Sequence, residues 1–197
     1  MSEPSRELIL ASTSPYRRRL LDRLGVVFRC VAPDVDEEPA SGEAPRDLAA
    51  RLAREKALAV ARQFPDARVL GSDQTASVGD QRLGKPGTEA RARKQLALCS
   101  GRTVHFYTAV ALAIGGRICE ERCVRTEVVF RPLTEGEIAE YVALEQPLDC
   151  AGSFRWEGPG IGLFEALRSD DPTALEGFPL ISVAAMLRRH PAAPGRS

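Results

Sequence analysis

The chain has no excess of either charge. Its 197 residues include 27 Lys and Arg and 27 Asp and Glu, so the formal net charge is zero. Proteins that bind long nucleic acids through many phosphates usually carry a basic excess, so we expect no nucleic-acid partner. A small phosphorylated ligand needs only a few local cations and stays compatible with this balance.

Histidine and paired cysteine are also scarce. The two histidines, His105 and His190, lack the spacing to a cysteine pair that a zinc site needs. The five cysteines are odd in number and form no Cys-x-x-Cys motif, which favours free thiols in a reducing compartment. The sequence lacks a signal-peptide core and any run long enough to span a membrane. We therefore expect a cytoplasmic protein without a membrane partner, ending in a disordered tail over 191–197.

What the chain does contain is an alternation of apolar strand patterns and amphipathic helix patterns. We expect strands at 8–11, 26–31, 67–72 and 163–166, a long hairpin at 103–114 and 118–130, and helices at 15–24, 45–63, 88–99, 134–144 and 179–189. Strands interleaved with helices around a central hairpin predict an α/β fold with a mixed, twisted sheet in two lobes around a central cleft.

The segment after the first strand has the features of an anion-binding helix start. Ser14 is a good N-cap, and Pro15 follows at the first helical position, where its missing N–H costs nothing. An arginine in the first turn opposes the helix dipole, so Arg17 suggests a bound phosphate or carboxylate. The alternatives are that Arg17 is an ordinary surface arginine and that Tyr16 is a core aromatic.

A lysine lies in the apolar stripe of the second helix. Lys56 has apolar neighbours three and four residues away on both sides, where a lysine is seldom buried unpaired. It either projects a cation into a binding site or snorkels to nearby solvent. Arg51 and Glu55 on the same helix predict a routine surface pair.

Two acids are candidates for catalysis or metal binding. Asp73 follows an apolar strand, and α/β sheets bind ligands at the carboxyl ends of their strands. It could activate water or hold a divalent metal, or be a loop aspartate that bonds its own backbone. Glu37 could be a second acid, although its acidic turn could simply be solvated.

A glycine-rich segment, 150–162, permits close backbone approach to a ligand and carries Glu157 beside Trp156. The alternative is an ordinary turn with a packed tryptophan. Lys85, before Pro86, is by itself typical of a loop.

Taken in order, these motifs resemble the Maf proteins, a family of nucleoside triphosphate pyrophosphatases. The matching segments are Leu-Ala-Ser-Thr-Ser-Pro-Tyr-Arg at 10–17, Asp-Val-Asp-Glu at 34–37, Arg-Leu-Ala-Arg-Glu-Lys-Ala at 51–57, Gly-Ser-Asp-Gln at 71–74, Gly-Lys-Pro at 84–86, Ala-Gly-Ser-Phe at 151–154 and Gly-Phe-Pro-Leu at 177–180.

The resemblance implies a fold like that of the inosine-triphosphate pyrophosphatases, with residues 1–190 forming one catalytic domain of two lobes and the site in the cleft. It implies that water attacks the α-phosphorus of a nucleoside triphosphate with the help of Mg²⁺ or Mn²⁺, releasing diphosphate. The implied roles are catalysis by Asp73, phosphate binding by Ser14, Arg17, Lys56 and Lys85, and metal binding by Glu37 and Asp73.

The resemblance to one branch of the family also implies a substrate. Tyr16, Gln74 and Glu157 resemble the specificity positions of the branch that acts on 7-methyl-GTP, although that branch typically has Trp where this chain has Tyr16. An aromatic ring attracts a cationic methylated guanine, and a carboxylate accepts its N–H groups. The alternatives are a UTP/dTTP pyrophosphatase and a non-catalytic nucleotide-binding regulator of septum formation. A homodimer is compatible with the sequence.

Overall fold

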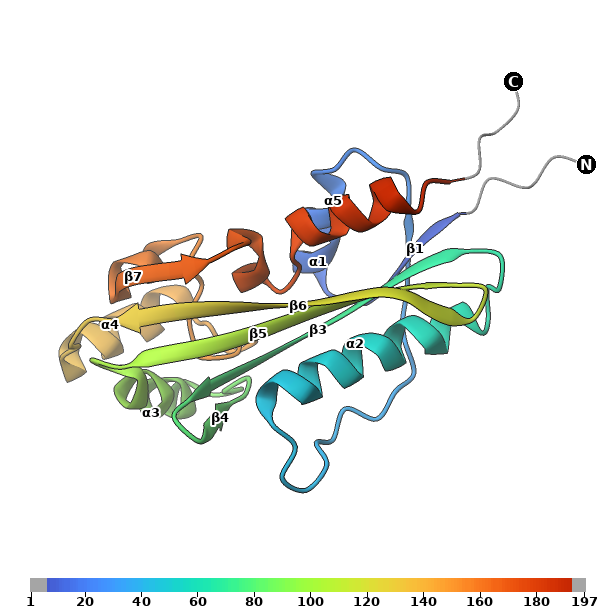
Figure 1. The fold of residues 1–197 in the computed structure, drawn as a ribbon. Helices are drawn as coiled ribbons and strands as arrows, with labels where there is room; N and C mark the ends of the chain where they lie inside the picture. The colour runs from blue at the N-terminus through green and yellow to red at the C-terminus, as the bar shows by residue number, and fades with distance from the viewer. Residues whose placement is uncertain (1–6, 193–197) are drawn as a thin grey trace, which may run out of the picture. The chain divides into compact units, whose positions relative to one another are not determined.

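The computed structural model describes residues 7–192, within which strands and helices alternate as the sequence predicts (Figure 1). The strands are β1 (Leu8–Ala11), β2 (Arg29–Val31), β3 (Arg68–Val78), β4 (Gln81–Leu83), β5 (Thr103–Ile114), β6 (Arg117–Phe130) and β7 (Phe164–Ser169). The α-helices are α1 (Pro15–Asp22), α2 (Pro45–Ala61), α3 (Glu89–Cys99), α4 (Glu135–Glu145) and α5 (Leu180–Arg189), and the 3-10 helices are η1 (Pro159–Leu163) and η2 (Pro172–Glu176). From residue 193 onward, the predicted tail lies outside the described residues.

All seven strands belong to one mixed sheet with the order β2-β1-β3-β5-β6-β7, and β4 pairs with β3. β1 runs parallel to both β2 and β3, whereas β4 is antiparallel to β3 and β7 is antiparallel to β6. The predicted α/β class with a mixed sheet is confirmed.

The chain divides into two compact units. The first unit consists of the residues up to Gln74, Thr108–Val124, and the residues from Asp171 onward. The second unit consists of Thr75–Tyr107 and Arg125–Asp170. Strands β3, β5 and β6 each contribute residues to both units.

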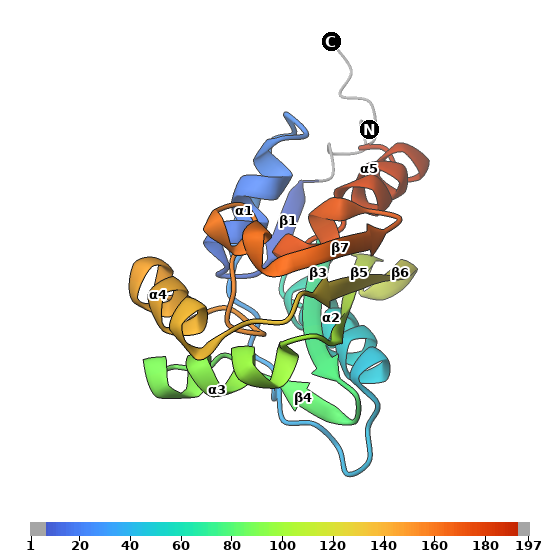
Figure 2. The same cartoon turned by 90° about the vertical axis from the view of Figure 1, so that its left-hand side faces the viewer.

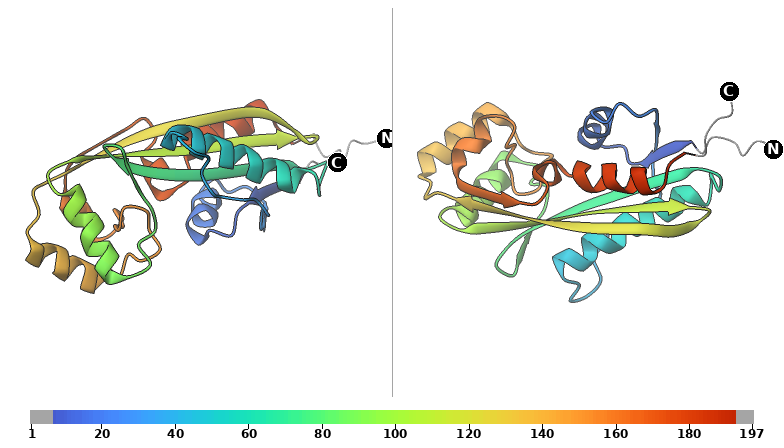
Figure 3. Two further views of the ribbon diagram at one scale, coloured as in Figure 1. Left: turned by 90° about the horizontal axis from the view of Figure 1, so that it is seen from below. Right: turned by 45° about the horizontal axis from the view of Figure 1, so that its top comes forward.

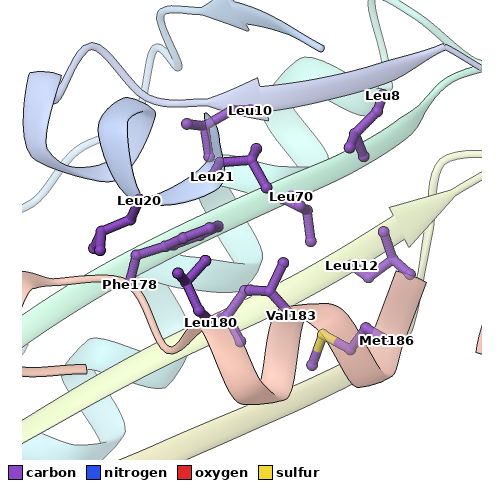
Figure 4. Packing of buried hydrophobic residues seen from close by; sticks show 11 residues of the cluster. Leu8, Leu10, Leu20, Leu21, Leu70, Leu112, Phe178, Leu180, Val183 and Met186 are labelled. Atoms are coloured by element: carbon purple, nitrogen blue, oxygen red, sulfur yellow. The ribbon is translucent and has the colours of Figure 1, made fainter. Parts of the chain in front are cut away.

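In the first unit, helices cover both faces of the sheet (Figures 1 and 2). Leu8 and Leu10 of β1 belong to a buried apolar cluster to which α1 contributes Leu20 and Leu21, and α5 contributes residues including Met186 (Figure 4). Ile9 alternates to the opposite face, which α2 covers, and is fully buried.

Gly71 allows α2 to lie directly on β3. A Cβ atom at this position would come within 2.3 Å of the Ala53 carbonyl oxygen and 2.4 Å of the Ala57 nitrogen. Both atoms belong to the helix backbone, which cannot give way as a flexible side chain could. Glycine at position 71 therefore sets how closely the helix that carries Lys56 approaches the strand that carries Asp73.

In the second unit, α3 and α4 lie side by side (Figure 3), and four phenylalanine rings pack together. The rings of Phe106, Phe130, Phe154 and Phe164 form edge-to-face pairs with centroids 5.0–5.5 Å apart. Such contacts add to the stabilisation that comes from burying the rings. A capping box is present at the start of α4, where Thr134 and Glu137 bond each other's backbone nitrogens.

Several predicted boundaries are wrong. β3 continues to Val78 instead of ending at Ser72, because the side chains of the polar residues after Ser72 still alternate between the two faces of the strand. Its last residues, Ala76–Val78, pair with β4, a strand that was not predicted. The strand predicted at 26–31 is shortened to β2, since Val27 is almost fully exposed. η2 was also not predicted. Apolar periodicity detects neither short edge strands nor single helical turns.

Candidate functional site

The predicted N-cap and first turn of α1 are formed. Ser14 is the N-cap of α1, its Oγ accepts a hydrogen bond from the Arg17 nitrogen, and Pro15 is the first helical residue. Arg17 is half-buried, and its Nε donates to the carbonyl oxygen of Gly177 at 2.9 Å. Arg17 is therefore held by a distant segment of the chain, and the ordinary surface arginine is the wrong alternative.

The centre of the site is an ammonium group between two carboxylates. Lys56 Nζ lies 2.7 Å from Asp73 Oδ1 and 2.7 Å from Glu37 Oε1. Only 6% of the Lys56 side chain and 10% of the Asp73 side chain are exposed. Because a buried charge is costly unless it is paired, these contacts explain how a lysine is accommodated in an apolar stripe. The snorkelling alternative is wrong.

The prediction that Asp73 lies at the carboxyl end of its strand is wrong, because Asp73 lies inside β3. The parallel pairing of β1 with β3 ends at Ala11 and Gly71, and Asp73 follows two residues later. It lies on the α2 face of the strand, and its contact is with Lys56 and not with its own backbone. Its second oxygen, Oδ2, accepts no hydrogen bond from residues 7–192. That oxygen is the atom available to accept a proton.

Glu37 is the exposed member of the group, with 62% of its side chain accessible. The turn that carries it is fixed by Arg51, which donates to the Glu38 carbonyl oxygen and to both carboxylate oxygens of Glu43. Hydrogen bonding to Glu43 is the main cause that raises the pKa of Arg51 above its ordinary value. The predicted Arg51–Glu55 pair forms, whereas local sequence patterns do not indicate the contacts of Arg51 with Glu38 and Glu43.

The other face of β3 carries polar side chains that bond the segment around η2. Gln74 Nε2 donates to the carbonyl oxygens of Ala174 and Leu175 and to Thr108 Oγ1. Ser72 is fully buried, and its hydroxyl lies 2.7 Å from the Ala109 carbonyl oxygen and 3.2 Å from that of Gly177. The Gly177 carbonyl thus meets both Ser72 and Arg17.

The site balances two cations against two anions. Burial lowers the pKa of Arg17, whereas the carboxylates of Asp73 and Glu37 raise it; an arginine keeps its charge under such conditions.

Within residues 7–192, no group of three or more His, Cys, Asp or Glu side chains could hold a metal ion. Glu37 and Asp73 together can therefore offer a metal at most part of its coordination shell.

Tyr16, the predicted specificity residue of the helix start, is half-buried and is not a fully buried core aromatic. The Arg19 guanidinium lies over its ring, 4.9 Å from the centroid. One face of the ring therefore already has a cationic neighbour, as expected for an electron-rich surface that attracts positive charge.

The remaining predicted residues, Lys85 and Glu157, belong to the second unit, and both are exposed. The glycine-rich segment around Glu157 is tightly built, because the Tyr141 hydroxyl accepts a hydrogen bond from the Arg155 nitrogen. A Cβ atom at Gly160 would come within 2.1 Å of the Arg155 carbonyl oxygen. Trp156 is half-buried, and its Nε1 has no hydrogen-bond partner in the described chain.

The fold and this geometry define an α/β protein with a buried lysine that is ion-paired to two carboxylates. A family model described as Maf-like protein matches residues 7–190. The chain belongs to the Maf family, as the resemblance predicted.

Curated relatives are similar over nearly the whole chain. A "7-methyl-GTP pyrophosphatase" from Xanthomonas oryzae pv. oryzae is 58% identical, with 92% of this chain and 95% of the relative aligned. A protein of the same name from Bordetella avium is 53% identical, with 96% of each chain aligned.

Solved structures support the fold. A HAM1 protein from Coxiella burnetii gives a TM-score of 0.51 at 16% identity, covering 93% of this chain and 99% of that one. The Staphylococcus aureus Ham1 protein gives 0.51 at 14% identity, covering 94% and 100%. At such identities, the likeness concerns the fold alone.

Proposed function

We propose that this chain is a nucleoside triphosphate pyrophosphatase that hydrolyses 7-methyl-GTP to 7-methyl-GMP and diphosphate. The observation that carries the proposal is the buried Lys56 between Asp73 and Glu37 in a chain of the Maf family. Relatives that are 53–58% identical and carry the name 7-methyl-GTP pyrophosphatase support the substrate.

In the proposed reaction, a water oxygen attacks the α-phosphorus, and the bond from that phosphorus to the oxygen bridging to the β-phosphorus breaks. Diphosphate leaves with the bridging oxygen, while the nucleoside monophosphate gains the water oxygen. Asp73 orients the water and accepts its proton at Oδ2, because its Oδ1 is already bonded to Lys56. Lys56 holds this carboxylate in place and supplies positive charge to the phosphates.

We assign three further residues to phosphate binding. Ser14 caps the start of α1, where the helix dipole favours an anion, and Arg17 has its Nη atoms unbonded by other residues within 7–192. Lys85 is exposed on the second unit and available to a ligand. An arginine fork and a lysine ammonium provide the charge-assisted hydrogen bonds that phosphate oxygens need.

The carboxylates fit a divalent metal that also binds the substrate. Glu37 and Asp73 touch the same ammonium nitrogen, so they already converge on one cation. Mg²⁺ is commonly held by one or two carboxylates together with substrate phosphates, a donor set that this pair would complete. Mg²⁺ or Mn²⁺ held there would offset the negative charge that builds on the leaving diphosphate.

Base selectivity is assigned to Tyr16, Gln74 and Glu157. The Tyr16 ring can stack on the cationic methylated guanine, and Trp156 is the alternative stacking residue. The Glu157 carboxylate can accept the N1 and N2 protons of guanine, which uracil and thymine do not present in the same arrangement.

The proposed setting is the cytoplasm. The five cysteines are free, as is usual in a reducing compartment. No helix within residues 7–192 is long and apolar enough to cross a membrane. The homodimer stays a prediction.

A panel of triphosphates tests the function. Purified protein is incubated with 7-methyl-GTP, GTP, UTP and dTTP in the presence of Mg²⁺ or Mn²⁺, and diphosphate and orthophosphate are measured separately. We expect diphosphate release with the highest kcat/KM for 7-methyl-GTP.

The same panel separates the alternatives. Faster turnover of UTP or dTTP than of 7-methyl-GTP would contradict the substrate, and orthophosphate as the first product would contradict the reaction. Nucleotide binding without hydrolysis would favour the non-catalytic regulator.

A further inference from the structure

Two predicted ligand-binding side chains are tied to one short segment of the first unit, which we call the 171–177 turn (Asp171–Gly177). Arg17 Nε donates to the Gly177 carbonyl oxygen at 2.9 Å. Gln74 Nε2 donates to the carbonyl oxygens of Ala174 at 2.8 Å and Leu175 at 3.1 Å. Backbone carbonyls of a single turn therefore fix side chains from both α1 and β3.

These bonds decide which atoms remain for a ligand. With Nε occupied, the Arg17 guanidinium keeps Nη1 and Nη2, to which no other residue within 7–192 is hydrogen-bonded. The Gln74 amide nitrogen faces only acceptors, so its N–H groups are used and its Oε1 is left as an acceptor. Held by the turn, Arg17 offers its two Nη groups to a phosphate, and Gln74 offers its Oε1 to a donor group of a nucleotide base.

The turn can hold this position because Gly177 has a backbone conformation suited to glycine. Its φ is +96°, in the left-handed region that side chains disfavour. The next residue, Phe178, is fully buried in the apolar cluster that includes Leu20 and Leu70. The carbonyl that meets Arg17 is therefore anchored directly to the core.

The other end of the turn is braced by a buried acid and a hydroxyl. Asp171 is 2% exposed, and its Oδ2 accepts a hydrogen bond from the Ile181 nitrogen at 2.8 Å. Thr173 Oγ1 donates to Asp171 Oδ1 at 2.7 Å and accepts from the Leu180 nitrogen at 2.9 Å. These bonds tie the turn to the first residues of α5, whose N–H groups have no acceptor within the helix itself.

We propose that Asp171 and Thr173 are positioning residues for the reaction. By bracing the 171–177 turn against α5, they aim the Gly177, Ala174 and Leu175 carbonyls, which in turn orient Arg17 and Gln74. This role rests on the proposed function, because it acts through residues assigned to substrate binding. Neither residue is itself expected to contact the nucleotide.

The test compares variants of the brace with a matched helix cap elsewhere. Thr173→Val removes both hydroxyl contacts, Thr173→Ser keeps them, and Asp171→Asn keeps an oxygen for the Ile181 nitrogen. Thr134→Ala removes the cap of α4 in the second unit, so it weakens a helix start without touching the turn. Each purified variant is assayed for kcat/KM on 7-methyl-GTP well below its own Tm.

We expect Thr173→Val and Asp171→Asn to lower kcat/KM by about 10-fold to 100-fold, because small displacements of substrate-binding groups have effects of this size. Thr173→Ser should recover activity to within about threefold, and Thr134→Ala should lower Tm while leaving kcat/KM unchanged. In an Arg17→Ala background, Thr173→Val should lower kcat/KM by a smaller factor than it does alone, since part of its effect passes through Arg17.

Three results would overturn the inference: unchanged kcat/KM in both Thr173→Val and Asp171→Asn, no recovery in Thr173→Ser, or full multiplication of the losses with Arg17→Ala. Asp171→Asn decides the matter if Thr173→Val does not fold. A wild-type chain that hydrolyses no triphosphate would instead contradict the proposed function itself.

Discussion

The two compact units hold their predicted functional residues in opposite ways. In the first unit, Lys56 and Asp73 are buried, ion-paired and carried by regular elements, α2 and β3. In the second unit, Lys85 and Glu157 are exposed on connecting segments, and neither has an ion pair within the described chain. The charged groups of Lys56 and Asp73 are held by each other, whereas those of Lys85 and Glu157 are accessible to a ligand.

The scaffolds differ accordingly. The first unit positions side chains through other polar groups, as in Arg51 holding the turn of Glu37. In the second unit, aromatic packing and the close contact of Gly160 with Tyr141 and Arg155 hold the backbone of the glycine-rich segment, 150–162. The comparison teaches that substitutions of Lys56 and Asp73 in the first unit should alter stability and chemistry together, whereas substitutions of Lys85 and Glu157 in the second should alter ligand binding without loss of stability.

The largest effect is expected from removing the shared ammonium. Lys56→Met leaves the buried Asp73 carboxylate without its partner, and breaking a buried pair in this way costs about 3 kcal/mol of unfolding free energy. We also expect a loss of kcat of about 1,000-fold, because the charge beside the phosphates is lost. Urea unfolding and steady-state kinetics measure the two effects.

Asp73→Asn is the matched variant, because its amide oxygen can still accept from Lys56. It should keep most of the stability while lowering kcat by about 100-fold or more through loss of the base. Retention of full activity in Asp73→Asn would contradict the assigned mechanism.

A backbone contact gives the next effect. Gly71→Ala forces a methyl group against the α2 backbone and should destabilise the protein by about 3 kcal/mol, with reduced kcat because Lys56 moves relative to Asp73. Gly136→Ala is the control, since its Cβ would meet nothing within 4 Å and alanine favours the helix. Equal Tm values for the two variants would show that α2 is not held against β3 as described.

The sequence predicted the components of the first unit better than their connections. Ser14 was identified as an N-cap from its residue type and the proline after it, and Lys56 was identified from its apolar neighbours. Arg51 and Asp171 were not identified as positioning groups, because their partners are separated along the chain or lie on the backbone. Local patterns cannot reveal contacts that only the folded chain creates.

The second unit offers a test of selectivity without loss of stability. Glu157→Gln should lower kcat/KM for 7-methyl-GTP by about 10-fold to 100-fold, the discrimination that a paired base contact provides. Its Tm should stay unchanged, because the side chain is exposed. Glu165→Gln, at another exposed position of the second unit, should change neither quantity. A large fall in Tm for Glu157→Gln would place this residue with the structural charges.

The smallest effect concerns a structural charge of the second unit. Hydrogen bonds from the backbone and side chain of Thr134, together with Arg131, lower the pKa of Glu137 from its ordinary 4.5 to about 2. The ionised group therefore stabilises the fold above about pH 4.5, and this contribution is lost as the pH falls toward 2. The Tm difference between wild type and Glu137→Gln should shrink over that range.

A Tm difference for Glu137→Gln that is constant from pH 6 to pH 2 would contradict the lowered pKa.

The boundaries of the predicted elements failed where short polar segments decide the structure. β3 was expected to end at Ser72 because the polar residues Asp73, Gln74 and Thr75 follow its apolar run. The structure keeps them in a strand because their partners lie on both faces: Lys56 on one, and the 171–177 turn on the other. Helices with clear caps, such as α3 and α4, were predicted to within about one residue.

The central claim is that the first unit directs water to the α-phosphorus. Hydrolysis of 7-methyl-GTP in ¹⁸O-labelled water, followed by mass spectrometry of both products, tests it most directly. The account predicts that the label enters 7-methyl-GMP and that the diphosphate carries none. Label in the diphosphate, or in released orthophosphate, would contradict it.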